Sequence, residues 1–259
     1  MPSAPLATIT GHLDALLRTS EVPDYPGALN GLQVECRAPI TRVAVAVDAS
    51  LQTIQGALDA GANLLVVHHG LFWSGVQALR GNTYERFRRL LANDVAVYSS
   101  HLPLDVHPTL GNNALLARAL DLDPVESFAR FQSISVGVAG LADVATESLA
   151  ARADAIARAE GGALVSVGIT AGRRTRRWAI CTGAGASSDT LREAADANVD
   201  TLIVGEGPHH TGVDAAERGI AVLYVGHYAT ETFGVRALGA ELERQFGLPW
   251  SFVAAPTGL

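Results

Sequence analysis

Residues 42–68 read RVAVAVDASLQTIQGALDAGANLLVVH and carry the strongest structural signal in the chain. Two short runs of apolar, largely β-branched residues, Arg42–Asp48 and Asn63–His68, flank a segment with helical periodicity, Leu51–Ala60. Strands that are apolar on both faces belong to sheets covered by helices on both sides. The alternation of strand and helix favours parallel pairing, so this stretch predicts an α/β fold.

The same alternation continues through most of the 259 residues. Six further strands are predicted at Val95–Ser99, Ser133–Ala139, Ala163–Gly168, Arg177–Thr182, Thr201–Gly205 and Ala221–Gly226. Six further helices are predicted at Thr83–Asn93, Asn112–Leu120, Thr146–Ala157, Ser188–Ala197, Val213–Arg218 and Thr230–Gln245. The sequence DLDPVESFAR at Asp121–Arg130 breaks the pattern. We expect it to join an N-terminal α/β lobe, residues 1–125, to a C-terminal one, residues 126–259, each with a mostly parallel sheet.

The composition excludes several classes of protein. The chain has 26 acidic and 19 basic residues, a net charge of -7, which argues against a nucleic-acid partner. No apolar run approaches the ~18 residues of a membrane span, and the first residues lack the pattern of a signal peptide. Only Cys36 and Cys181 are present, which excludes a disulfide framework and an all-cysteine zinc site. We therefore expect a cytoplasmic protein.

The histidines are the informative residues. His68 and His69 end a predicted strand in the sequence NLLVVHHGLFW. Because neighbouring side chains on a strand point to opposite faces, the two imidazoles can serve two separate sites. Ligands of α/β sheets bind beyond the carboxyl ends of the strands, where this pair falls. The alternative is one packed and one solvated histidine.

Three more predicted strands are followed by histidines and carboxylates. His101 and Asp105 follow one strand, and an imidazole with a carboxylate suits a divalent metal, although a polar loop is an equal alternative. His227 and Glu231 follow another in AVLYVGHYATE, where a helix that begins early brings both to one side. The alternative for Glu231 is an ordinary carboxylate at a helix start.

The fourth strand is followed by GEGPHH, which contains Glu206, His209 and His210. A solvated histidine pair at a helix start is the simpler interpretation there. Seven of the eight histidines nevertheless lie at or just beyond strand ends. Together they predict a metal site, with two ions because there are more ligands than one tetrahedral ion uses.

Two further motifs have simpler interpretations. TGAGASSD at Thr182–Asp189 lacks the pattern of a phosphate-binding loop, so we expect a tight turn. The basic run RRTRR at Arg173–Arg177 is expected to be a solvated turn between strands, with attraction of a phosphorylated substrate or nucleic acid as the alternative.

Six segments resemble those of a known family in their order and in their residues, and the resemblance runs from about Asp24 to Phe252. They are DYPGALNGLQVE, VVHHGLFW, LLANDVAVYSSHLPLDVHPTLGNN, AICTGAGAS, IVGEGPHHT and VGHYATE. The chain is similar to the short bacterial form of the Ngg-interacting-factor-three-like family. Members carry the names GTP cyclohydrolase I type 2 or dinuclear-metal-centre hexameric protein.

The resemblance implies two α/β lobes that face each other across a cleft holding two divalent ions, assembled into a homohexamer. Carried over, His69 and Asp105 would bind one ion, His68 and His227 the other, and Glu231 would bridge them. His101 would lie beside the ions with a catalytic role. The donor types suit Zn, Fe, Mn, Co or Ni.

We therefore expect a dinuclear metal-dependent hydrolase acting on a nucleotide or another phosphorylated small molecule, with opening of the purine ring of GTP as the specific candidate. The alternative is a non-catalytic ring that carries metal or serves as a scaffold. A ring that engages nucleic acid or partner proteins ranks last because of the negative charge.

Overall fold

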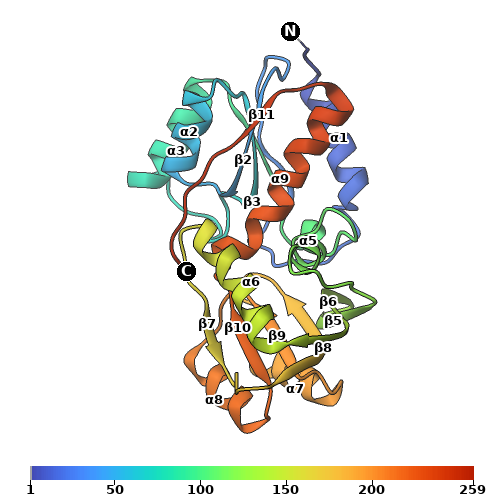
Figure 1. The fold of residues 1–259 in the computed structure, drawn as a ribbon. Helices are drawn as coiled ribbons and strands as arrows, with labels where there is room; N and C mark the ends of the chain where they lie inside the picture. The colour runs from blue at the N-terminus through green and yellow to red at the C-terminus, as the bar shows by residue number, and fades with distance from the viewer. Residues whose placement is uncertain (1) are drawn as a thin grey trace. The chain divides into compact units, whose positions relative to one another are not determined.

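The computed structural model describes residues 2–259, which form two compact units (Figure 1). The first unit contains the chain up to Leu104 together with Gly234–Ala255, and the second contains Asp105–Phe233 and Pro256–Leu259. Both units are discontinuous in sequence, so they divide the chain differently from the contiguous lobes 1–125 and 126–259. Each unit has its own sheet and its own apolar core.

The sheet of the first unit has five strands in the order β1-β4-β3-β2-β11. Their bounds are β1 Gly31–Val34, β2 Val43–Asp48, β3 Leu64–His69, β4 Ala96–Ser99 and β11 Trp250–Phe252. β11, β2, β3 and β4 are parallel, and only β1 is antiparallel. The expected parallel strands are therefore present, and the carboxyl ends of β2, β3 and β4 meet at one edge of the sheet.

Helices cover both faces of this sheet, as its apolar strands require. The helices that contribute to this unit are α1 Leu6–Leu17, α2 Leu51–Asp59, α3 Gly81–Ala92, α4 Leu102–Asp105 and α9 His227–Phe246. Figure 1 shows α2 and α3 on one side of β2 and β3, and α1 and α9 on the other. Ile54 and Leu90 pack against Leu65 and Val67 of β3, and each such buried side chain contributes about 1.5–3 kcal/mol.

The second unit has six strands in the order β5-β6-β8-β9-β10-β7. Their bounds are β5 Glu126–Phe131, β6 Ile134–Ala145, β7 Val165–Val167, β8 Arg174–Cys181, β9 Thr201–Val204 and β10 Ala221–Tyr224. Only β8, β9 and β10 pair in parallel, so this sheet is mixed rather than mostly parallel. A two-residue connection joins β5 to β6, and a connection that short can only link antiparallel strands. The expected passage at Asp121–Arg130 therefore contains most of β5.

Helices again cover both faces. Their bounds are α5 Asn112–Ala119, α6 Thr146–Ala159, α7 Ser188–Asp196 and α8 His209–Glu217. α5 and α6 pack on the face that carries Trp178 and Ile180, whereas α7 and α8 pack on the face of Leu202 and Val204. The predicted helices are present, but α8 and α9 begin earlier than expected, at His209 and His227. His209 and His210 therefore lie in the first turn of α8, and His227 and Glu231 lie at the start of α9.

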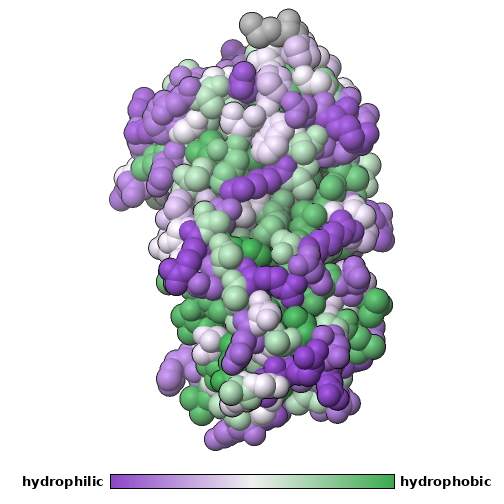
Figure 2. All heavy atoms as spheres, viewed as in Figure 1, coloured by the Kyte–Doolittle hydropathy of each residue, from purple (hydrophilic) through white to green (hydrophobic). Residues whose placement is uncertain are grey.

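The surface adds two findings. Hydrophilic residues cover most of the outward surface of α2 and α3 in Figure 2. Among the described residues, no helix combines the length and apolar character needed to cross a bilayer.

The expected turn at Arg173–Arg177 is wrong, because β8 begins at Arg174 and takes up most of the run. The Arg174 side chain pairs with Asp143, and that of Arg177 pairs with Glu126. These local acids offset the basic charge, which weakens the case for a nucleic-acid surface there.

Candidate metal centre

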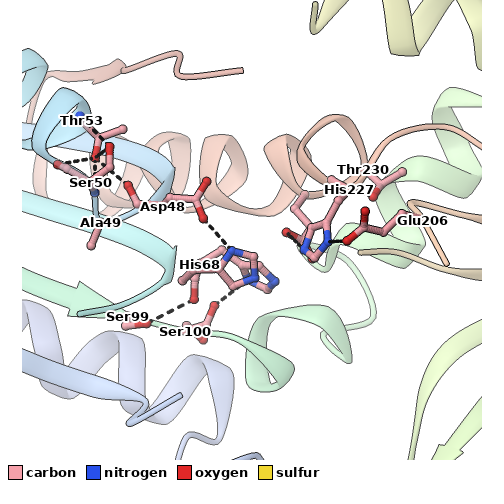
Figure 3. Close-up of polar contacts among 12 residues, drawn as sticks. Asp48, Ala49, Ser50, Thr53, His68, Ser99, Ser100, Glu206, His227 and Thr230 are labelled. Carbon is pink, nitrogen blue, oxygen red and sulfur yellow. Dashed lines mark hydrogen bonds and ion pairs between the residues drawn. The ribbon is translucent and has the colours of Figure 1, made fainter. Parts of the chain in front are cut away.

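The first donor set lies in the first unit, at the carboxyl end of β3. His68 is fully buried, and its Nδ1 lies 2.8 Å from the carbonyl oxygen of Ser100 (Figure 3). A carbonyl oxygen can only accept, so Nδ1 carries the proton and Nε2 carries the lone pair that a metal ion needs. The hydroxyl of Ser99 donates to the carbonyl of His68 at 3.2 Å, which fixes this strand end further.

His69 is oriented by the neighbouring strand. Asp48 ends β2 directly opposite His69 in the parallel ladder. Its Oδ1 lies 2.9 Å from Nδ1 of His69. A carboxylate on one ring nitrogen is the arrangement that commonly orients a metal-binding histidine and raises the basicity of the other nitrogen.

His101 is held in the same way by Asp24. Their Nδ1 and Oδ1 atoms are 2.8 Å apart, and the other carboxylate oxygen accepts from Asn30 at 2.8 Å and from the amide of Leu102 at 2.9 Å. Burial alone would raise the pKa of Asp24, but the hydrogen bond and charge of His101 lower it on balance. Asp24 is therefore an ionised anchor for the imidazole.

These three histidines form a compact set. One ring nitrogen from each of His68, His69 and His101 lies within 4.8 Å of those of the other two. Since Nδ1 of every ring already faces an acceptor, Nε2 is the nitrogen that remains suited to a cation. The structure thus brings His101 together with two of the predicted ligands.

The second donor set lies in the second unit, at the start of α9. The helix begins at His227, so Glu231 lies one turn further on the same side, as the sequence indicated. Nε2 of His227 is 3.1 Å from Oε2 of Glu231. Its Nδ1 is 2.7 Å from Oε1 of Glu206 (Figure 3). Thr230 does not cap this helix but lies inside it, where its hydroxyl accepts from the amide of Gly183 at 3.0 Å.

The two carboxylates determine the charge of His227. Burial alone would lower the pKa of this imidazole, but the hydrogen bonds and charges of Glu231 and Glu206 raise it to about 9. Without a metal ion, a proton therefore lies between the ring and Glu231. A divalent cation can take the place of that proton, because both atoms that flank it are metal ligands.

Gly183 makes room for this carboxylate. It has a φ of +62°, which a glycine adopts readily. A Cβ at this position would collide with Oε1 of Glu231 and lie 3.4 Å from Nε2 of His227. The TGAGASSD motif therefore does more than form a turn, since its first glycine is the wall against which the Glu231 carboxylate rests.

Asp105, the remaining predicted ligand, belongs to the second unit. It is buried, and its Oδ1 accepts from the side-chain amide of Asn112 at 2.8 Å. The nearby thiol of Cys181 has a pKa raised to about 12 by burial first, and then by the charges of Asp105, Glu193 and Glu231. The thiol is therefore neutral, and oxygen and nitrogen atoms are the available donors here.

The other histidines stay apart from these sets. His209 and His210 are exposed at the start of α8, and neither belongs to a cluster of ligand atoms among the described residues. His107 is half-buried, and its Nδ1 accepts from the amide of Leu110 at 3.0 Å. The roles of Asp24, Asp48 and Gly183 were not predicted from the sequence. Only Asp48 left a signal, since it ends the strand beside His68 and His69.

The fold and the two donor sets define an α/β protein with a candidate metal centre built from histidine and carboxylate side chains. The sequence profile of the family described as Duf34/NIF3 (NGG1p interacting factor 3) matches residues 6–257, and the chain belongs to this family.

Named relatives cover nearly the whole chain. A protein from Deinococcus radiodurans named "GTP cyclohydrolase 1 type 2 homolog" is 42% identical over 249 residues, covering 95% of this chain and 92% of its own. A protein of the same name from Pyrococcus abyssi is 36% identical over 261 residues, which cover 97% of this chain and 98% of its own. Among solved structures, "protein ybgI, unknown function" has a TM-score of 0.88 at 33% sequence identity. The match covers 98% of this chain and 99% of that one.

Proposed function

We propose that this protein is a divalent-metal-dependent hydrolase that acts on a nucleotide or another phosphorylated small molecule. The observation that carries the proposal is the orientation of His68, His69 and His101. Each ring has Nδ1 committed to an acceptor, so the nitrogens suited to a cation converge. Such preparation is typical of a metal site and is not needed for packing.

The proposed site holds two ions and draws on both donor sets. His69 and Asp105 would hold one ion and His68 and His227 the other, with Glu231 as the bridge. This grouping is the one that the family resemblance implies.

The donor atoms of these residues fit divalent metal ions. Imidazole and carboxylate ligands suit Zn, Fe, Mn, Co or Ni. The Cys181 thiol, neutral in the metal-free protein because burial raises its pKa, belongs to no cluster of ligand atoms among the described residues. When bound, divalent ions supply Lewis acidity that lowers the pKa of water and polarises a substrate oxygen. His101 is not one of the proposed ligands in this grouping. Asp24 accepts from its Nδ1–H, so its Nε2 would accept a proton from water and return it to the leaving group.

The substrate proposal draws on the relatives. Proteins named "GTP cyclohydrolase 1 type 2 homolog" make hydrolytic opening of the purine ring of GTP the first reaction to test. The homohexamer implied by the family resemblance and a cytoplasmic location belong to the same proposal. Light scattering on the purified chain tests the assembly.

The decisive experiment is the metal content per chain in the wild type and in Glu231→Ala, followed by turnover of GTP and simple phosphate esters. Glu147→Ala is the matched control, because Glu147 is an exposed glutamate of the same unit. We expect two ions per chain, lost in Glu231→Ala but not in the control, and product from the wild type. Two ions per chain without turnover of GTP or of any phosphate ester would instead support a metal carrier or scaffold.

A further inference from the structure

A pocket of about 260 Å³ lies beside His69, entirely within the first unit. Its wall includes the end of β2, the segment that follows it, the Trp73 region and one side chain of α3, Arg86. The volume is below the roughly 300–1,000 Å³ of sites that enclose a whole drug-sized ligand. The pocket therefore fits one group of a larger substrate.

Arg86 is an uncommitted cation in this pocket. Its two contacts are long, 3.4 Å to the carbonyl of Ala49 and 3.5 Å to the hydroxyl of Thr83, and its buried Nε has no acceptor. Within residues 2–259, no carboxylate pairs with it. The other arginines of the same helix, Arg88 and Arg89, bond to Glu85 at 2.7–2.8 Å.

Further donors line the same pocket. The side chains of Ser74 and Gln77 make no hydrogen bond to another described residue. The hydroxyl of Thr53 donates to the carbonyl of Asp48 at 2.6 Å, so the Ser50 hydroxyl is the donor in the 3.2 Å contact between Ser50 and Thr53. A ligand in the pocket would take the place of Thr53 as the acceptor of this long hydrogen bond. α2 begins just after Ser50, so the positive end of its dipole lies at the pocket.

One acid, Asp48, also lines the pocket. Its Oδ1 is occupied by His69, which directs that part of the negative charge toward the imidazole. Apart from His69 and the indole N–H of Trp73, the remaining side chains offer one guanidinium, two hydroxyls and one amide. A phosphoryl group has three terminal oxygens for these donors, whereas a carboxylate has two.

We propose that this pocket binds a phosphoryl group of the substrate, with Arg86 as its main ligand. The inference rests on the proposed function for its link to catalysis, because a phosphoryl group held here lies beside a predicted metal ligand. Arg86 is then a specificity-determining residue that selects phosphorylated over unphosphorylated compounds. Its planar fork suits bidentate contact with phosphoryl oxygens.

The test is calorimetric titration of the full chain, at measured metal content, with inorganic phosphate, guanosine monophosphate, guanosine and acetate. The variants are Arg86→Gln and Arg86→Lys. Arg88→Gln is the matched control, because it removes the same charge from the same helix at a side chain outside the pocket. Thermal unfolding of each variant shows that it is folded.

We expect Arg86→Gln to weaken binding of phosphate and guanosine monophosphate by 10- to 100-fold, the loss expected for one charge-assisted contact. Arg86→Lys should lose part of that, and Arg88→Gln should stay within about twofold. Guanosine and acetate should bind weakly to every variant. Metal content should not change, so binding to the metal ions alone cannot mimic the result.

Equal affinity of Arg86→Gln and wild type for phosphate, with both folded, would overturn the inference. Stronger binding of acetate than phosphate would also overturn it. The outcomes separate from those of the proposed function. Arg86-dependent phosphate binding without turnover would support the phosphoryl pocket and contradict the proposed hydrolase activity. Turnover with an unchanged KM in Arg86→Gln would support the hydrolase activity and contradict the phosphoryl pocket.

Discussion

The two donor sets prepare their histidines in opposite ways. In the first unit, Nδ1 of His68, His69 and His101 each faces one acceptor, and one nitrogen of each ring faces the other two rings. In the second unit, both nitrogens of His227 face carboxylates, and its pKa is raised to about 9. The first set thus offers lone pairs, while the second holds a proton that a metal ion must displace.

The largest effect is expected from Gly183→Ala, which tests the second set without changing a ligand. The new Cβ would collide with Oε1 of Glu231, so the carboxylate must move away from His227. We expect metal affinity at this pair to fall by more than about 100-fold, beyond the usual effect of a supporting residue. Backbone strain should also destabilise the protein by about 1–3 kcal/mol.

Gly61→Ala is the matched control. Gly61 has a φ of +68°, close to the +62° of Gly183, but a Cβ there meets nothing within 4 Å. Gly61→Ala should lower the thermal stability as Gly183→Ala does but should leave the metal affinity unchanged. Thermal unfolding measures the stability, and calorimetry measures the metal affinity. Equal metal affinity in the two variants would mean that Glu231 is not a ligand and that the second set does not exist as described.

The next largest effect is the pH dependence of metal affinity and of stability at His227, which distinguishes the second donor set from the first. The folded pKa of His227, about 9, lies above its ordinary value of 6.5. The stabilisation from this imidazolium in the metal-free protein is therefore complete below about pH 6.5 and is lost as the pH rises through 9. Metal affinity at this pair should rise by roughly tenfold per pH unit up to that point, because one proton is released on binding.

Calorimetry in buffers of different ionisation enthalpy counts that proton directly. Glu206→Gln removes one of the two charges that raise the pKa of His227, so the rise in affinity should level off at a lower pH. If no proton is released between pH 7 and 9, the metal ion does not replace the proton of His227.

The comparison also shows what the sequence reveals and why. His68, His69 and the His227–Glu231 pair were predictable, because local strand and helix geometry places them. Asp24 was not, since it reaches His101 from 77 residues away. Gly183 was not either, because nothing local distinguishes a glycine required by φ from one required by a distant carboxylate.

The fold shows the same contrast. β2, α2 and β3 were predicted from apolar periodicity, which reports how deeply a segment is buried. The pairing direction of β5 and β6 depends on a two-residue turn, which the periodicity of either strand does not report. The division of ligands between two ions rests on family resemblance and stays a prediction, since it depends on how residues of both units combine.

The smallest effect is expected from Cys181→Ala. This thiol is buried close to Asp105 and Glu231, yet its pKa is raised to about 12, and metal ions bind thiolate rather than thiol. Metal content should therefore equal that of the wild type, with a stability change of about 1 kcal/mol from the lost packing. Elemental analysis and thermal unfolding measure both. A loss of metal would show that a bound cation lowers the pKa enough to recruit the thiolate. The second set would then be a sulfur-containing site that favours softer ions, and its contrast with the all-imidazole set would lie in ligand type rather than in protonation.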